Sequence, residues 1–164
     1  MDAPSSFAAA ASAVPQSTGL QRLMERRALH PVFQPIFDLA QGRHFACEAL
    51  IRGPEHDSLH LPDALFAAAF AEGRTYELEW MAVEAAIAQF AVQRSALRLF
   101  INMSIGCLHS SRGRLPDIRR DLMRLGISPS RIVVEITENE SVTEYSDLQD
   151  LLRDVRRLGI QIAM

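Results

Sequence analysis

Two charged side chains stand out in the apolar stretch CEALIR, residues 47–52. The segment 44–51 holds apolar and aromatic residues between two glycines, which predicts a short strand. Because side chains alternate across a strand, Glu48, Leu50 and Arg52 share one face. Charged groups are seldom buried without a partner, so this face either reaches solvent at a strand end or lines a polar site.

Two further predicted strands each carry one oxygen-bearing side chain among apolar neighbours: Asn102 in FINMS and Glu135 in VVEIT. Two carboxylates and an amide oxygen are hard ligands, which favour Mg2+, Mn2+ or Ca2+ over zinc. Such a cation serves phosphoryl chemistry as a Lewis acid and as a source of hydroxide. If the strand ends meet as in an α/β barrel, Glu48, Asn102 and Glu135 are candidate metal ligands. The alternative is that each side chain caps its own strand or satisfies a loop.

The other polar groups are interpreted as structural. The histidines share no metal-ligand spacing, and the arginines of 112–120 have no interleaved aromatic residues, which favours a solvated helix face over a nucleic-acid site. The acids of 138–144 predict a solvated turn and a helix N-terminus. Cys47 and Cys107 are expected to be small core residues, since they have neither metal-ligand spacing nor the density of a disulfide scaffold.

The composition is that of one globular domain. The chain has 164 residues, of which 48% are hydrophobic and 23% charged. Its net charge of -3 gives no general attraction to nucleic-acid polymers or anionic membranes, so an anionic ligand needs a local site. The sequence has no apolar run of spanning length and no signal-peptide pattern, and its two cysteines fit a reducing compartment. These features predict a cytoplasmic protein without a membrane segment.

Strands and helices are expected to alternate over most of the chain. Residues 1–18 are rich in Ala, Ser and Pro without periodicity, which predicts a disordered tail before a domain of 19–164. Pro35 cannot donate to a strand ladder, so its strand is expected at a sheet edge or at a bulge. The expected strands are 32–37, 44–51, 97–103, 132–136 and 160–164; the expected helices are 20–29, 62–72, 76–92, 116–125 and 143–158, with a Ser/Gly/Arg loop before residue 116.

The connections between these elements indicate the fold class. The first two strands are joined so closely that they are best paired antiparallel, because a parallel pair needs a long crossover. From about residue 97 onward, strands alternate with helices, which implies parallel strands with right-handed crossovers. A barrel of eight such units usually needs about 250 residues. We therefore expect an α/β fold: an incomplete TIM-like (β/α) barrel with an antiparallel first strand, and an open strand edge at 160–164.

Four short motifs occur in this order along the predicted strands: QPI at 34–36, EALIR at 48–52, NMS at 102–104 and EITE at 135–138. Together they resemble the EAL-domain cyclic-di-GMP phosphodiesterases. The resemblance identifies 19–164 as the N-terminal portion of an EAL domain, and it implies a modified TIM barrel whose first strand is antiparallel to its neighbour. It also implies site roles. Glu48, Asn102 and Glu135 match divalent-metal ligands, and Gln34, Leu50 and Arg52 match substrate contacts, with Arg52 on a phosphate.

The implied reaction is hydrolysis of one phosphodiester bond of cyclic-di-GMP to linear pGpG, with two Mg2+ or Mn2+ ions activating the water. In the family, the segment that matches 159–163 is followed by a pair of metal-binding aspartates, and later strands bring a lysine, a glutamate and a glutamine. Here the sequence stops at Met164, so we expect a truncated domain that is inactive alone.

Three interpretations of the chain stay open. The first is that it is the N-terminal part of a working phosphodiesterase, with a sensory or GGDEF-type domain fused in a longer parent protein. The second is a non-catalytic module that binds cyclic-di-GMP or a partner protein, and the third is an unstable remnant without function, which the open strand edge favours.

Overall fold

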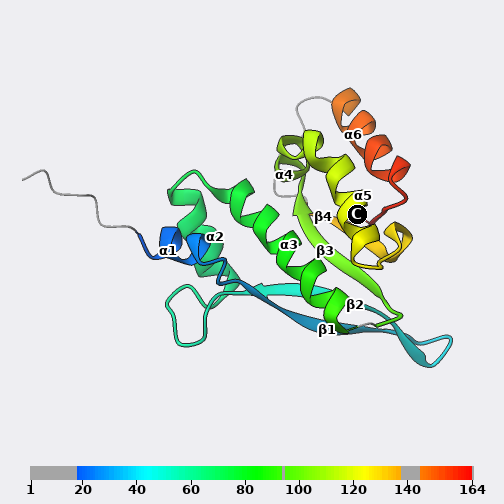
Figure 1. Cartoon of the computed structure of the whole chain (residues 1–164), viewed down its shortest axis with the longest axis horizontal. Coiled ribbons are helices and arrows are strands. Elements are labelled where there is room, and N and C mark those ends of the chain that lie inside the picture. The colour runs from blue at the N-terminus through cyan, green and yellow to red at the C-terminus, as the bar shows by residue number, and fades with distance from the viewer. Residues whose placement is uncertain (1–17, 94, 138–144, 164) are drawn as a thin grey trace, which may run out of the picture.

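Figure 1 shows the computed structural model of the chain, which describes residues 18–93, 95–137 and 145–163. Its strands form one sheet in the order β1-β2-β3-β4-β5, the same as their order along the chain. All five predicted strands are confirmed, with slightly different bounds. They are β1 (His30–Asp38), β2 (Arg43–Arg52), β3 (Arg98–Ser104), β4 (Ile132–Thr137) and β5 (Gln161–Ala163).

The first two strands form the predicted antiparallel hairpin. Phe33 pairs with Ala49 in the middle of it, and the register shifts between Ile36 and Phe37, one residue beyond Pro35. β1 also lies at the edge of the sheet, so the expected edge position and the expected irregularity are both found. Asp38 closes the hairpin, because its carboxylate accepts hydrogen bonds from the backbone amides of the two turn residues 40 and 41.

The other strands run parallel. β2 pairs with β3, β3 with β4 and β4 with β5, each in parallel register. Helices connect the parallel strands, which is the βαβ arrangement that the alternating elements predicted. The α/β class with an antiparallel first strand is therefore confirmed, and the described strands form part of a TIM-like (β/α) barrel.

The helices are those expected, with two differences. Residues 104–110 were predicted as loop but contain a six-residue helix, and the first helix ends at Glu25 instead of residue 29. It closes early because Arg27 adopts a left-handed φ of 50°, with Arg27 N bonded to Met24 O and Ala28 N to Leu23 O. The helices are α1 (Gly19–Glu25), α2 (Pro62–Ala71), α3 (Thr75–Gln93), α4 (Ile105–Ser110), α5 (Leu115–Arg124) and α6 (Tyr145–Arg157), with short 3-10 turns η1 (Arg112–Arg114) and η2 (Pro129–Arg131).

Two apolar clusters hold these elements together. The larger one lies between the sheet and helices α3 to α6, and it contains Phe90, Leu122 and Leu151 with alternate residues of β3 and β4. The smaller one joins α1, α2 and the first turns of α3, around Leu20 and Leu65. Figure 1 shows α1 and α2 at one end of the molecule and α4, α5 and α6 at the other, with α3 running between them.

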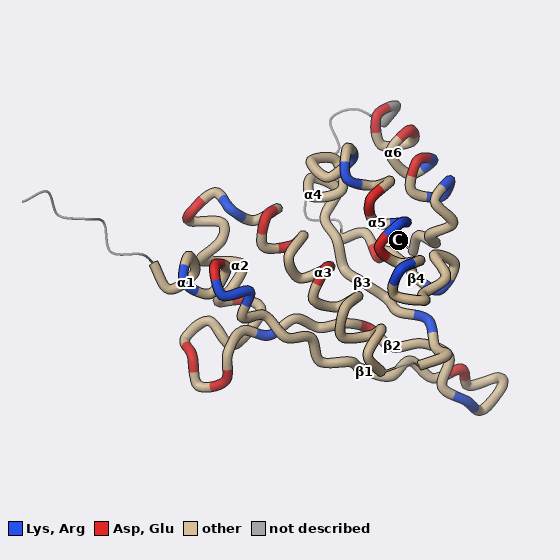
Figure 2. Tube along the Cα trace, in the orientation of Figure 1, with Lys and Arg blue, Asp and Glu red and all other residues tan. Residues whose placement is uncertain are grey.

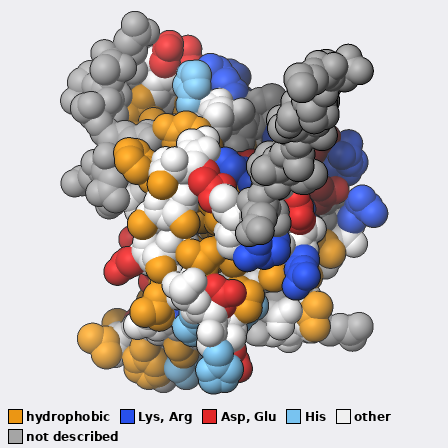
Figure 3. Space-filling model, turned by 90° about the vertical axis from the view of Figure 1, so that its left-hand side faces the viewer, with side chains coloured by type: hydrophobic (Ala, Val, Ile, Leu, Met, Phe, Trp, Pro, Cys, Tyr) orange, Lys and Arg blue, Asp and Glu red, His pale blue; other side chains and the backbone are white. Residues whose placement is uncertain are grey.

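Most of the charged residues lie outside the strands. In Figure 2, the Arg, Asp and Glu residues gather on helices and connections, whereas the strands are largely uncharged. Figure 3 looks onto the end formed by α1 and α2, where hydrophobic side chains lie at the surface among charged ones. Phe70 of α2 is 81% exposed. Within the described residues, no helix is both long and apolar enough to cross a membrane.

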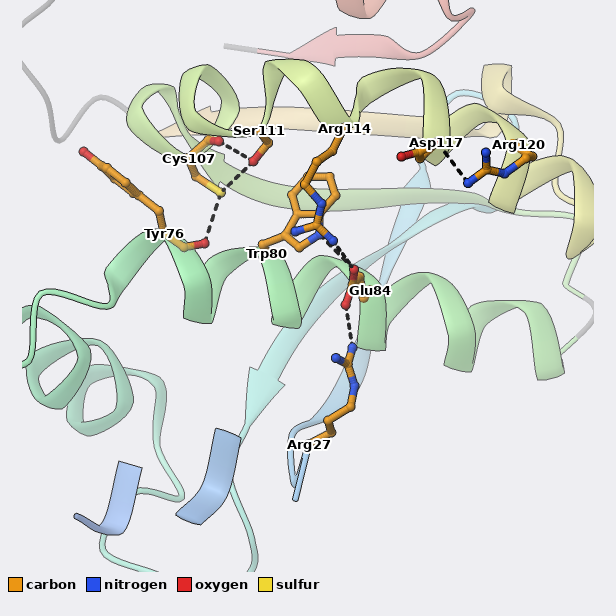
Figure 4. A network of polar contacts seen from close by, with 9 residues as sticks. All are labelled: Arg27, Tyr76, Trp80, Glu84, Cys107, Ser111, Arg114, Asp117 and Arg120. Carbon is orange, nitrogen blue, oxygen red and sulfur yellow. Dashed lines mark hydrogen bonds and ion pairs between the residues drawn. The ribbon is translucent and has the colours of Figure 1, made fainter. Parts of the chain in front are cut away.

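A polar network ties α3 to its neighbours on the outer side of the fold (Figure 4). Glu84 accepts hydrogen bonds from Arg27, from Arg114 at 2.7 Å and from the Trp80 indole at 2.8 Å. The Arg114 guanidinium also lies over the Trp80 ring, 4.3 Å from its centroid. One carboxylate on α3 therefore holds the segment before β1 and the segment before α5.

Candidate functional site

The structure brings the three predicted metal ligands onto neighbouring strands. Asn102 on β3 is the register partner of Glu135 on β4. The side-chain amide Nδ2 of Asn102 donates a hydrogen bond to Glu48 Oε1 on β2, over 2.7 Å. Glu48, Asn102 and Glu135 therefore occupy one face of three adjacent parallel strands.

The strand pattern explains why these side chains share that face. Leu99, Ile101 and Met103 of β3 alternate with Asn102 and are buried against the helices. Asn102 consequently points to the opposite face, where it is exposed. Glu135 stands in the same relation to its buried neighbours in β4 and is half-buried. The helices thus cover one side of the sheet, and the oxygen-bearing side chains line the other.

The hairpin adds the predicted substrate contacts Gln34 and Leu50 to this face. Gln34 lies directly opposite Glu48, and Val32 lies opposite Leu50. Gln34 is exposed and Leu50 is half-buried. The side chain of Gln34 is therefore next to the carboxylate that also accepts the Asn102 hydrogen bond.

Arg52 lies one strand repeat beyond Leu50, at the end of β2. Its Nη1 donates to the carbonyl oxygen of Ile51 at 2.8 Å, so the guanidinium is folded against its own backbone. The loop that follows is closed by a hydrogen bond from Gly53 N to His60 O of 2.9 Å. Arg52 is thus on the predicted strand face, but apart from the cluster around Glu48.

The donor set fits a hard divalent cation. Two carboxylates and one carboxamide supply oxygen ligands, and the Asn102 hydrogen bond already holds the amide beside the Glu48 carboxylate. Among the residues that the structure describes, no three His, Cys, Asp or Glu side chains come together as a metal cage. A cation at this strand edge would therefore use the Asn102 amide oxygen, water or groups beyond this set. Glu138, from the EITE motif, lies outside the described residues.

One acidic residue near the site was not singled out from the sequence. Glu79 of α3 lines a cavity of about 130 Å³ together with Leu50 and Asn102. In the sequence, Glu79 stands three and seven positions before Ala82 and Ala86, which line the same cavity. A carboxylate on the inward-facing stripe of a helix is the signal that would have identified it.

A larger cavity lies away from these strand ends. It measures about 550 Å³ and lies between α3 and α5, with Trp80, Ile87 and Leu122 among its lining residues. The two cysteines are buried, as predicted. Burial raises the pKa of the Cys107 thiol to about 12 and also raises that of Cys47, so neither thiol is activated.

Comparison with known proteins gives consistent results. An uncharacterized signaling protein of Caulobacter vibrioides is 32% identical over 80% of this chain and 16% of its own length. The probable cyclic di-GMP phosphodiesterase PdeB of Escherichia coli is 29% identical over 74% of this chain and 24% of its own length. The chain therefore spans about a quarter or less of the length of these relatives.

A solved structure agrees with the fold. BlrP1 of Klebsiella pneumoniae, in a manganese and cyclic-di-GMP complex, superimposes with a TM-score of 0.72 and 27% identity, over 84% of this chain and 34% of that one. The EAL domain family itself matches residues 18–164. With the strand order, the antiparallel hairpin and the four motifs in place, the chain belongs to the EAL domain family.

Proposed function

We propose that this domain binds cyclic-di-GMP and, within the protein to which it belongs, hydrolyses one phosphodiester bond to give linear pGpG. The observation that carries the proposal is the contact of Asn102 with Glu48 beside Glu135 on adjacent strands. The names of PdeB and of the BlrP1 complex support the same substrate.

In this proposal Glu48, Asn102 and Glu135 hold a divalent cation, Mg2+ or Mn2+. When bound, the cation supplies Lewis acidity at a phosphate oxygen and lowers the pKa of a bound water. The protein contributes the fixed placement of its oxygen ligands. The hydrogen bond between Asn102 and Glu48 holds these two groups together in the absence of ligand. Less conformational entropy is therefore lost when the ligand binds.

Gln34, Leu50 and Arg52 are proposed to contact the nucleotide. Leu50 offers an apolar surface and Gln34 offers both a donor and an acceptor. The planar guanidinium of Arg52 suits a phosphate, which it can bind through two parallel hydrogen bonds. To do so it would exchange its hydrogen bond to the Ile51 carbonyl for the ligand.

We expect the 164 residues on their own to bind without hydrolysing. The described strands bring three ligand side chains together, which suffice for one cation but are few for a two-metal site. Because the chain spans only 16% and 24% of the lengths of its relatives, we place the domain in a larger protein. A sensory or GGDEF-type domain is the proposed partner module. The buried free thiols fit a cytoplasmic setting.

Calorimetric titration of the 164-residue chain with cyclic-di-GMP, in Mn2+ and in EDTA, tests the binding. Saturable binding that EDTA abolishes is expected. Glu48→Gln should weaken it by about tenfold or more, because a ligand to the cation is lost. Glu77→Gln is the matched control, since Glu77 is an exposed acid of α3 that pairs with Arg74. Absence of binding at tens of micromolar would overturn the proposal.

Hydrolysis needs a second experiment, on the longest open reading frame that contains these residues. Mn2+-dependent release of pGpG from that protein is the expected result. A protein that binds cyclic-di-GMP but leaves it intact with either metal would instead support a non-catalytic binding module.

A further inference from the structure

β3 leads directly into helix α4, with no loop between them. Ser104 is the last residue of the strand, and α4 begins at Ile105. Asn102, which contacts Glu48, lies only two residues before this junction. The direction in which the Asn102 side chain leaves the strand therefore depends on how the junction is held.

Glu79 of α3 holds the junction with a single oxygen. Its Oε2 accepts the backbone N–H of Ser104 at 3.0 Å and the hydroxyl of Ser104 at 2.8 Å. The same hydroxyl oxygen accepts the N–H of Cys107 at 3.1 Å and so caps α4. Because the hydroxyl proton points to Glu79, a lone pair is left for Cys107.

Removing Glu79 would destabilise the end of β3. Ser104 is 7% exposed, so its backbone N–H would be left buried without this acceptor. An unpaired buried amide is expensive, and the junction would shift to find another partner. The cavity of about 130 Å³ that Glu79 and Asn102 both line gives the strand end room to move.

We propose that Glu79 is a positioning residue that fixes the carboxyl end of β3 and thereby directs the Asn102 amide toward Glu48. Glu79 acts through Ser104, and it touches neither ligand nor cation in this role. The alternative is that Glu79 merely stabilises the start of α4, with no effect on Asn102. The proposal concerns the geometry of the chain itself, and only its effect on affinity rests on the proposed function.

NMR of the isotope-labelled chain tests the geometry without any ligand. Glu79→Ala should move the side-chain amide resonances of Asn102 away from their hydrogen-bonded positions and speed exchange of the Ser104 amide. Glu79→Gln retains an acceptor oxygen and should restore most of both signals. Glu77→Ala, on the same helix but paired outward with Arg74, is the control and should leave both unchanged.

Two results would overturn the proposal. One is an Asn102 side-chain resonance in Glu79→Ala that stays at the wild-type position. The other is a shift of equal size in Glu79→Gln and Glu79→Ala, since the acceptor would then be irrelevant. If Glu79→Ala does not fold, Ser104→Ala replaces it. That variant keeps the backbone bond but loses the hydroxyl bridge, so a smaller shift of Asn102 is expected, and no shift counts against the proposal.

The affinity arm uses cyclic-di-GMP with Ca2+ as the probe. Glu79→Ala should weaken binding by about tenfold, and Glu79→Gln should stay close to wild type. The two arms separate the failures. If the wild-type chain binds no nucleotide, the proposed function fails, and the NMR arm still decides on Glu79. If wild type binds and Glu79→Ala binds equally well, the positioning role is overturned.

Discussion

Gln34 and Glu48 lie directly opposite each other in the antiparallel hairpin, on the face that the helices leave uncovered. On its other side, Glu48 accepts the amide of Asn102. One carboxylate is thus flanked by two carboxamides on neighbouring strands. Both amides can turn an oxygen toward a cation or a nitrogen toward a phosphate oxygen, which gives the site adaptable groups around a single charge.

Asn102→Ala should separate binding from stability. The hydrogen bond to Glu48 is exposed, so its loss is expected to cost less than about 1 kcal/mol of unfolding free energy. Cation-dependent nucleotide binding should fall by about tenfold or more. Urea denaturation and calorimetry measure the two effects. A large loss of stability with unchanged binding would contradict the assignment.

Gly53→Ala should damage the loop that follows Arg52. A Cβ at this position would lie closer than 3.0 Å to the backbone oxygen of Leu59, which cannot move aside as a side chain would. We expect a loss of about 1–3 kcal/mol in unfolding free energy, as for other overpacked sites. Gly113→Ala is the control, because nothing lies within 4 Å of its Cβ. Equal stability of the two variants would show that the loop adjusts freely.

Leu122→Ala tests the cluster between the sheet and the helices. Leu122 is 0% exposed, and the next residue on α5, Met123, is 63% exposed. Truncation at Leu122 should cost about 2–5 kcal/mol through lost burial and a residual cavity. Met123→Ala should change stability by less than about 0.5 kcal/mol. Thermal unfolding of the two variants gives the comparison, and similar melting temperatures would argue against the observed packing.

The Cys107 thiol should make stability fall in alkaline solution. Its pKa is raised from 9.0 to about 12, mainly by burial, so the folded protein keeps the thiol neutral. Below pH 9 the thiol is neutral in both states and its contribution is complete. Between about pH 9 and 12 only the unfolded chain ionises, and unfolding free energy falls by up to about 1.4 kcal/mol per pH unit.

The control for this effect is Cys107→Ala, which keeps every other titrating group. Its unfolding free energy should decline less steeply with pH than that of the wild type. Parallel pH profiles would contradict the raised pKa of Cys107.

Much of the fold could be predicted because its signals are local. Strand runs between glycines, Pro35 near an edge and the short hairpin connection each reflect a constraint on a few adjacent residues. Helix α4 was missed because it is only six residues long, too short for a visible period. Its cap, Ser104, is also the last residue of a strand, so neither element has a separate boundary signal.

The sequence predicted the contacts of the site that lie between strands, but not those between a strand and a helix. Parallel strand ends meet at one edge, so the meeting of Glu48 with Asn102, 54 positions apart, followed from the fold class. The bond from Ser104 to Glu79 did not follow, since it joins a strand end to a side chain on a neighbouring helix. Such a contact depends on the depth and rotation of α3, which the apolar pattern leaves undetermined.

The division of the interior into two apolar clusters has a consequence for how the molecule opens. Within the described part of the chain, α3 is the one element with fully buried residues in both clusters, so we expect α1 and α2 to detach from it as one cooperative unit while the sheet stays intact. Amide hydrogens of α1 and α2 should then exchange with solvent sooner than those of β3 and β4. Leu78 and Trp80, which flank Glu79, belong to different clusters. Glu79, the residue proposed to position Asn102, therefore lies at the boundary between the part of the molecule that opens and the part that stays folded.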